Sequence, residues 1–162
     1  MRKYETLHLV KGEDLNHHGT LFAARAAAWF VEAGFAAAAC EHGNTEEIVL
    51  RNVHSMSFSR PVKKGEVVRF TSRVVYAGTT SLVVGIEAVQ AITEERAIAG
   101  YITFVTVEED TGRKKAHKVI LDAAWDKEEE RQRKEALCLV KGRKLQTEPE
   151  KQKGEERLGE NI

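Results

Sequence analysis

A short polar segment with the sequence DLNHHGT, residues 14–20, directly precedes an apolar segment rich in alanine. It combines a carboxylate with the amide of Asn16, the imidazoles of His17 and His18, and Gly19, where a ligand can approach the bare backbone. Amide and carboxylate groups polarise a carbonyl, orient a water molecule and accept its proton, as the hydrolysis of an acyl group requires. The segment is therefore the first candidate for a catalytic site.

The two adjacent histidines raise the question of a metal ion. Neighbouring side chains point in different directions, and the spacing of His17 and His18 matches neither HExxH nor a His/Cys ligand framework. We therefore interpret them as polar lining of a site and expect no metal.

The segment that follows, residues 21–40, is predicted to form a helix with apolar residues on nearly every side. Such a helix must be buried nearly all round. The rival interpretation is a surface helix rich in alanine for its helix propensity, but exposing Trp29, Phe30 and Phe35 would cost about 1.5–3 kcal/mol each. The first turn of this helix offers unpaired N–H groups and a positive dipole end beside the polar segment, which suits a developing oxyanion.

Strand-like segments surround the helix. Residues 4–10 precede it, and four longer segments rich in Val, Ile, Thr and Phe follow it, at 47–56, 66–76, 81–91 and 97–108. Their short connections predict antiparallel neighbours. A short final strand at 117–121 and a charged helix at 124–144 complete the pattern. The sequence thus predicts an α+β fold, in which an antiparallel sheet of five to six strands wraps round one buried helix and a C-terminal helix follows.

One folded domain and a tail account for the 162 residues. We assign residues 1–145 to the domain and the polar residues 146–162 to a disordered tail. The 25 basic and 25 acidic residues give zero formal net charge, which argues against nucleic acid as a partner. Because Arg25 and Glu32 interrupt the most apolar run, and the two cysteines lack paired spacing, we expect a cytoplasmic protein without a membrane partner or a disulfide.

The motif N-x-x-G-x-L-F at residues 16–22, leading into a helix of small residues, resembles the acyl-CoA thioesterases (acyl-CoA hydrolases) of the hotdog fold. Three further features stand at that family's intervals: SFSRPV at 57–62 with the following Gly65-Glu66, AGTTS at 77–81, and YITFV at 101–105. Together they extend the resemblance over about residues 9–144, and the charged C-terminal helix is similar too.

The resemblance implies a homodimer with its sites at the dimer interface, often assembled further into a trimer of dimers that forms a hexamer. It also implies that the amide of Asn16 orients the substrate carbonyl or the water, whereas capping or turning the chain before the helix is the alternative. Coenzyme A would be part of the substrate, so no separate cofactor is expected. The expected substrate-binding residues are His18, Gly19, Thr20, Arg60, Thr79, Thr80 and Ser81, although the last three also fit an ordinary hairpin turn.

One departure from the family concerns the carboxylate that the resemblance implies on the central helix, twelve residues after the motif glycine. Val31 occupies that position here, and the next residue is Glu32. One step along a helix turns a side chain by about 100°, so Glu32 does not simply inherit the geometry. Glu32 is either the general base or, with Arg25 seven residues earlier, part of a polar stripe that faces solvent or the dimer partner.

We therefore expect an acyl-CoA thioesterase that hydrolyses acyl-CoA to the free acid and coenzyme A, with Asn16 and Glu32 as catalytic residues. A hotdog protein that binds acyl-CoA without turnover is the alternative, because Val31 takes no proton. A hotdog enoyl-CoA hydratase is less favoured: its loop carries an Asp and a His five residues apart, and Asp14 is followed at that spacing by Gly19.

Overall fold

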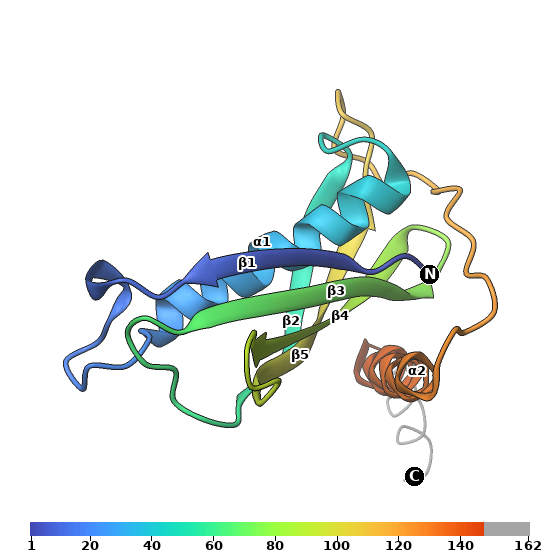
Figure 1. The fold of residues 1–162 in the computed structure, drawn as a ribbon. Helices are drawn as coiled ribbons and strands as arrows, with labels where there is room; N and C mark the ends of the chain where they lie inside the picture. Colours follow the sequence, from blue (N-terminus) through green and yellow to red (C-terminus); the bar gives the residue numbers. More distant parts are fainter. Residues whose placement is uncertain (148–162) are drawn as a thin grey trace, which may run out of the picture.

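The computed structural model describes residues 1–147, in which a five-stranded antiparallel sheet packs against two helices (Figure 1). In chain order the elements are β1 (Tyr4–Leu9), the 3₁₀ turn η1 (Gly12–Asp14), α1 (Ala23–His42), β2 (Ile48–Phe58), β3 (Val67–Ala77), β4 (Ser81–Gln90), β5 (Arg96–Thr106) and α2 (Lys127–Thr147). The strand order is β1-β3-β4-β5-β2, so β1 and β2 form the two edges. The predicted α+β class, the antiparallel sheet and the C-terminal helix are confirmed.

Some boundaries differ from the expectation. α1 begins two residues later than predicted, because Leu21 and Phe22 are extended and donate their N–H groups to the carbonyl oxygens of Val62 and Asp14, each at 2.8 Å. The predicted strand at 117–121 is wrong: this segment forms no strand within residues 1–147. α2 continues to Thr147, and the predicted tail from residue 148 onward lies outside the described residues.

α1 packs on one face of the sheet, and the main core lies between these two layers. Large side chains that are fully or almost fully buried fill it, among them Phe30 of α1 and Phe70, Ile86 and Phe104 of the strands. Gly34 allows the close approach, because a Cβ there would lie 2.8 Å from Cδ1 of Ile86. Burial of such side chains, at about 1.5–3 kcal/mol each, holds helix and sheet together.

α1 is central, as predicted, but its burial in a single chain is one-sided. Residues on the side that faces the sheet are buried, whereas Ala24, Arg25, Ala28 and Glu32 on the other side are exposed. Because the alanine side chains are small, this exposed side of α1 is nearly flat, so another helix or sheet can pack closely on it.

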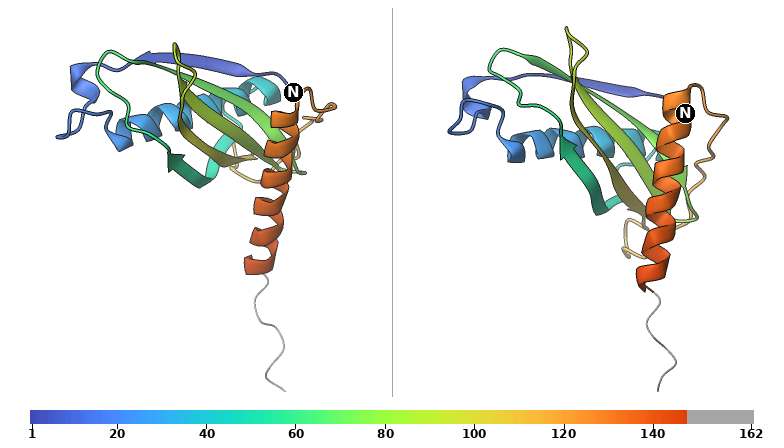
Figure 2. Two further views of the ribbon diagram at one scale, coloured as in Figure 1. Left: turned by 60° about the horizontal axis from the view of Figure 1, so that its bottom comes forward. Right: turned by 90° about the horizontal axis from the view of Figure 1, so that it is seen from below.

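α2 packs on the face of the sheet opposite to α1. Along β4 the side chains alternate: Val84 and Ile86 join the core under α1, whereas Val83 joins a smaller cluster with Val75, Tyr101 and Ala136. Figure 2 shows α2 projecting well beyond the sheet. Neither α1 nor α2, the two α-helices within residues 1–147, is long and apolar enough to cross a lipid bilayer.

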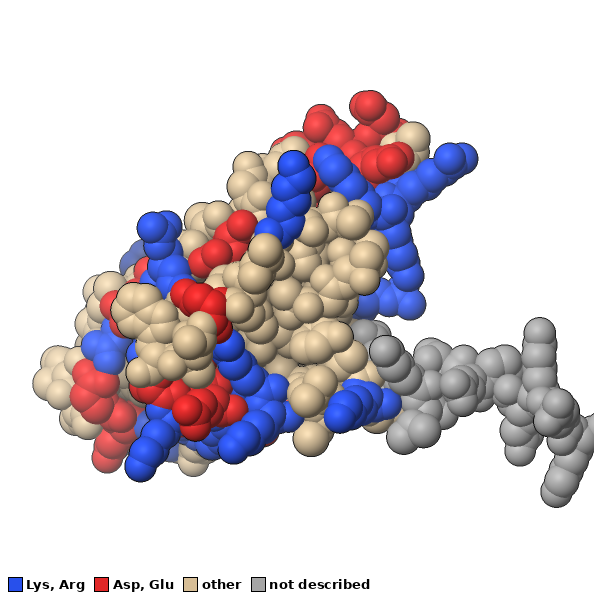
Figure 3. Space-filling view, turned by 90° about the vertical axis from the view of Figure 1, so that its right-hand side faces the viewer, with Lys and Arg blue, Asp and Glu red and all other residues tan. Residues whose placement is uncertain are grey.

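Ion pairs supplement the small apolar contact of α2. The carboxylate of Glu129 is fully buried and lies 3.2 Å from Nη1 of Arg73, which is itself only 4% exposed, and it also pairs with Arg133. Such cations offset the desolvation of a buried carboxylate. On the molecular face viewed in Figure 3, acidic and basic side chains are interspersed around an uncharged area.

The edge strand β2 exposes a row of apolar side chains. It hydrogen-bonds to β5 on one side only, and Val49, Leu50, Val53 and Phe58 are each 41–52% exposed. Its register against β5 shifts twice, and Ser55 adopts a positive φ of 48° at the second shift. An apolar edge with free backbone groups is prone to pair with another strand.

Candidate active site

The polar segment before α1 is folded around the side chain of Asn16. Its Oδ1 accepts hydrogen bonds from the backbone N–H groups of His18 at 2.9 Å and Thr20 at 3.2 Å, and its Nδ2 donates to Thr20 Oγ1 at 3.1 Å. Gly19 completes the turn with a φ of 74°, which favours glycine. Asn16 therefore turns the chain, but it does not cap α1, whose N-cap residue is Phe22.

The first turn of α1 has no side-chain cap. Phe22 provides none, and the N–H groups of Ala23, Ala24 and Arg25 have no hydrogen-bond partner among residues 1–147. These three residues are exposed. Unpaired N–H groups at the positive end of a helix dipole attract a negatively charged oxygen. The unpaired N–H groups that the sequence predicts at this helix end are therefore present within residues 1–147.

A pocket of about 250 Å³ lies beside the start of α1. Its walls are mostly apolar and include Leu21 and Ala26 from the α1 region, Phe58 at the end of β2, and Ile98 of β5. Arg60 is the charged residue among those that line it. The pocket thus combines an apolar lining with a cation near the uncapped helix end.

Arg60 is already engaged by carboxylates. Its Nη1 lies 3.3 Å from Oε1 of Glu66, and its Nε lies 3.6 Å from Oε2 of Glu95. A bridge between Thr20 and Lys63 joins the Asn16 loop to the same segment of chain. The structure therefore brings Asn16, His18, Gly19 and Thr20 close to the segment that carries Arg60, but a phosphate at Arg60 would compete with Glu66.

Glu32 does not pair with Arg25. The guanidinium of Arg25 instead places its Nε 3.1 Å from Oδ1 of the buried Asp14, so Arg25 and Glu32 share the exposed side of the helix without pairing with each other. Glu32 is exposed and makes no ion pair or hydrogen bond among the described residues. Its carboxylate is therefore free to take a proton or to meet a ligand.

Val31 and Glu32 lie on different sides of α1. Val31 packs on the core one turn before Phe35, whose ring contacts Phe104 of β5 at a centroid distance of 6.2 Å. Glu32 follows Trp29 by three residues and so lies towards β1, where the ring of His8 stacks on Trp29. Glu32 thus lies on the exposed side of the helix and Val31 at the border between that side and the core, separated by about 100°.

His8 was not anticipated from the sequence. Its ring lies 4.4 Å from that of Trp29 at an interplanar angle of 11°. Burial lowers the pKa of His8, and the negative charges of Glu32 and Asp14 partly oppose that shift. The available signal was weak: β1 alternates in burial, and His8 is a polar residue at an inward position of that alternation.

The turn that contains Thr79, Thr80 and Ser81 lies far from Asn16 within one chain. It follows β3, whereas the Asn16 loop contacts the segment before β3, so the eleven residues of that strand, about 36 Å, separate them. Its carbonyl groups are used internally, since Thr80 O accepts from the N–H of Thr106 at 3.0 Å. The structure does not bring this turn to the pocket in a single chain.

Comparison with known proteins agrees with the geometry. Residues 18–97 match the model of the thioesterase superfamily, and together with the fold this shows that the chain belongs to that superfamily, with a hotdog architecture. No curated protein matches the chain significantly.

Several solved structures are similar over most of the chain. An acyl-CoA hydrolase from Staphylococcus aureus, in complex with butyryl coenzyme A, coenzyme A and coenzyme A disulfide, shares 27% identity over 89% of this chain and 85% of that one, with a TM-score of 0.78. An acyl-CoA hydrolase from Bacillus cereus shares 20% over 89% and 87%, with a TM-score of 0.76. A hexameric thioesterase from Yersinia pestis shares 24% over 74% and 94%, with a TM-score of 0.62. The last two support the fold alone.

Two further solved structures are variants of the acyl-CoA hydrolase from Staphylococcus aureus. In one an asparagine is replaced by alanine, and in the other an aspartate fifteen residues further along that chain is replaced by alanine. The same distance from Asn16 leads here to Val31. That spacing agrees with the departure noted in the sequence.

Proposed function

We propose that this protein is an acyl-CoA thioesterase that hydrolyses acyl-CoA to the free acid and coenzyme A. The observation that carries the proposal is the uncapped first turn of α1, which lies beside a mostly apolar pocket and the Asn16 loop. An apolar pocket accepts an acyl chain, and the free N–H groups suit the oxyanion that forms when water attacks a thioester.

In the proposed reaction, the oxygen of a water molecule attacks the thioester carbonyl carbon. The N–H groups of α1 stabilise the oxyanion, the amide of Asn16 orients the carbonyl or the water, and Glu32 takes the proton of the water. The tetrahedral intermediate then collapses, the C–S bond breaks, and the thiolate of coenzyme A leaves and is protonated. His18, Gly19 and Thr20 bind the substrate near the reacting carbonyl.

The remaining substrate contacts come from a homodimer in this proposal. If β2 pairs antiparallel with β2 of a second copy, opposite ends of the two sheets lie side by side. The turn of Thr79, Thr80 and Ser81 in one subunit then approaches the Asn16 loop and Arg60 of the other. The exposed apolar edge of β2 and the exposed side of α1 support this arrangement, and a trimer of such dimers would form a hexamer.

A non-catalytic acyl-CoA-binding protein is the second candidate function. It is favoured by one observation: the side of α1 next to β5 carries Val31, and the free carboxylate of Glu32 lies about 100° away from it. Such a protein would keep the pocket and the helix N-terminus but lack a base at the reacting water. An enoyl-CoA hydratase is not supported, because Asp14 is buried against Arg25 and has Gly19, not histidine, five residues later.

Incubation with a panel of acyl-CoA thioesters of increasing chain length tests the function directly. We expect release of free thiol, measured with a chromogenic disulfide, at a rate proportional to protein concentration. Unsaturated acyl-CoA should be hydrolysed without prior hydration of its double bond. Tight binding of acyl-CoA without any thiol release would support the non-catalytic candidate instead.

If two copies pair through their β2 edges, a charged substitution on β2 should dissociate the dimer. Sedimentation should show a species larger than the 18.1 kDa chain at micromolar concentration. Replacing Val53, 41% exposed on β2, by aspartate should shift the population towards monomer and reduce hydrolysis, because charge on an edge strand opposes pairing. Leu7→Asp on the opposite edge strand β1, where Leu7 is 63% exposed, is the matched control and should leave the dimer intact. A stable, active monomer would contradict the shared site.

A further inference from the structure

The pocket beside the start of α1 has an exposed mouth and a buried floor. Phe58, at the end of the edge strand β2, is 52% exposed, whereas Ile98 of β5 is 1% exposed. These two residues are direct partners in neighbouring strands, so their side chains stand next to each other on one face of the sheet. The pocket therefore runs from the β2 edge inwards, between α1 and the sheet, and ends at Ile98.

Ile98 closes the inner end of the pocket. Its side chain belongs to the main core, and on the side away from Phe58 it pairs with Ala88 of β4. Ala88 is small and completely buried. A shorter side chain at position 98 would therefore extend the pocket towards Ala88.

The floor of this pocket offers no polar side chain among its lining residues. The buried ones are all hydrocarbon, namely Leu21, Ala26, Val62 and Ile98. Ser59 is exposed, and the guanidinium of Arg60 is held by Glu66 and Glu95. A polar group at the end of an acyl chain would lose its hydration at this floor without gaining a partner, which is unfavourable.

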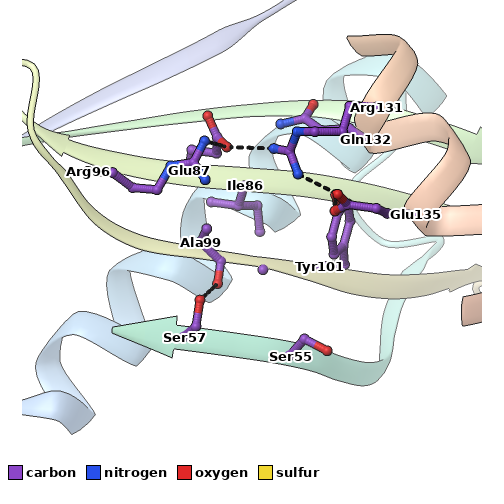
Figure 4. A pocket seen from close by; sticks show the side chains of 11 residues that line it. Ser55, Ser57, Ile86, Glu87, Arg96, Ala99, Tyr101, Arg131, Gln132 and Glu135 are labelled. Atoms are coloured by element: carbon purple, nitrogen blue, oxygen red, sulfur yellow. Dashed lines mark hydrogen bonds and ion pairs between the residues drawn. The ribbon is translucent and has the colours of Figure 1, made fainter. Parts of the chain in front are cut away.

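A second pocket, of about 230 Å³, lies on the face of the sheet that carries α2 and has a different character (Figure 4). Its walls carry charged side chains that pair with one another. Arg131 contacts both Glu87 and Glu135, with its Nη2 3.2 Å from Oε1 of Glu87. An apolar chain there would desolvate these ions without replacing their hydration. The pocket on the α1 side is therefore the one that suits an acyl chain.

The volume of the α1-side pocket limits the length of that chain. An apolar cavity of about 150 Å³ holds one benzene molecule, so each carbon atom needs about 25 Å³. The pocket volume of about 250 Å³ then corresponds to about eight to ten carbon atoms.

We propose that this pocket selects linear, unsubstituted acyl chains of up to about ten carbon atoms, and that Ile98 sets this limit. The inference rests on the proposed thioesterase function, which places the thioester carbonyl at the first turn of α1. From there the acyl chain enters the pocket, while coenzyme A stays outside along the β2 edge. Each buried methylene raises kcat/KM by about fourfold until the chain reaches Ile98, and a longer chain gains nothing more.

A series of acyl-CoA thioesters from butyryl to palmitoyl, in steps of one carbon and below their micelle concentrations, tests the limit. We expect kcat/KM to rise by about fourfold per methylene and then to stop rising at about eight to ten carbon atoms. Adipoyl-CoA ends a six-carbon chain in a carboxylate. It should react at least about 100-fold more slowly than hexanoyl-CoA, because the floor has no partner for that charge.

Two variants tie the limit to Ile98. Ile98→Val and Ile98→Ala remove one and three carbon atoms, so the longest chain that still gains should grow by about one and about three carbon atoms. Ile98→Val is a mild core substitution and carries the test even if Ile98→Ala unfolds. Ile102→Val is the matched control: Ile102 is completely buried on the same strand, about 13 Å further along, and its profile of chain lengths should match that of the natural protein.

Three results would overturn the proposal: kcat/KM that rises all the way to palmitoyl-CoA, a profile that Ile98→Val leaves unchanged, or equal rates for adipoyl-CoA and hexanoyl-CoA. Hydrolysis still occurs in each case, so the thioesterase proposal would stand. If no acyl-CoA is hydrolysed, the thioesterase proposal fails instead. Calorimetry with the matching series of non-hydrolysable acyl-CoA thioethers then decides the inference by affinity: a plateau at about ten carbon atoms supports it, and a continued rise overturns it.

Discussion

Asn16→Ala is expected to lower the turnover of acyl-CoA by about 10²-fold or more, which is the scale of removing one oxyanion-type donor. The amide has a second task in the structure, because Oδ1 of Asn16 accepts the N–H groups of His18 and Thr20. The alanine variant therefore removes both the catalytic group and the organiser of the loop. Measured kcat, KM and thermal midpoint together describe the combined loss.

Asn16→Asp separates the two tasks. A carboxylate still accepts hydrogen bonds from the N–H groups of His18 and Thr20, but it has no N–H to donate to a thioester or a water. We expect this variant to keep the thermal midpoint and to lose most of its turnover. Full activity of Asn16→Asp would show that the donor is not needed, and unchanged turnover of Asn16→Ala would leave Asn16 with turn formation alone.

Glu32→Gln is expected to abolish hydrolysis while acyl-CoA still binds. The amide has nearly the same shape as the carboxylate but cannot take a proton from water, and Glu32 is exposed without partners, so the fold should not change. Rates of thiol release and calorimetric binding of a non-hydrolysable acyl-CoA thioether measure the two properties independently.

Glu41→Gln is the matched control on the same helix. The carboxylate of Glu41 accepts a hydrogen bond from the hydroxyl of Tyr4 at 3.0 Å near the far end of α1, so its loss should leave turnover unchanged. Full activity of Glu32→Gln would place the base elsewhere. If the natural protein binds acyl-CoA and hydrolyses none, it is a non-catalytic binding protein, and the valine at position 31 explains the lack of turnover. Val31→Asp would then test whether a carboxylate at this position restores hydrolysis.

The fold could be predicted because the pattern of residue types is local. Val, Ile and Thr in segments bounded by turns indicate strands, and the apolar alanine-rich segment indicates a packed helix. The start of α1 could not be placed, because Leu21 and Phe22 are drawn into extended pairing by Val62 and Asp14. That pairing depends on contacts between distant parts of the chain, which residue periodicity does not record.

In the candidate site, too, the features that depend on neighbouring residues could be predicted, whereas those that depend on contacts between distant residues could not. The Asn16 loop was predictable since its hydrogen bonds connect residues within four positions of one another. The polar stripe of Arg25 and Glu32, the alternative to a catalytic Glu32, followed from helix geometry, and both residues are exposed; the binding of Arg25 by Asp14 from outside the helix could not be inferred in this way.

The buried pair of Arg73 and Glu129 has a consequence for how α2 is aligned on the sheet. The apolar contact of α2 is small: Ala136 is buried in it, and Leu139 and Val140 are partly buried beside it. A slip of one residue would turn the Glu129 carboxylate by about 100° and break its 3.2 Å contact with the buried guanidinium of Arg73, whose other carboxylate partner, Asp126, lies 3.6 Å away. Charge therefore acts together with packing to set the rotational register of α2. Because Gln132 follows Glu129 by three residues, the same ion pair fixes which side chain of α2 faces the strands one turn later.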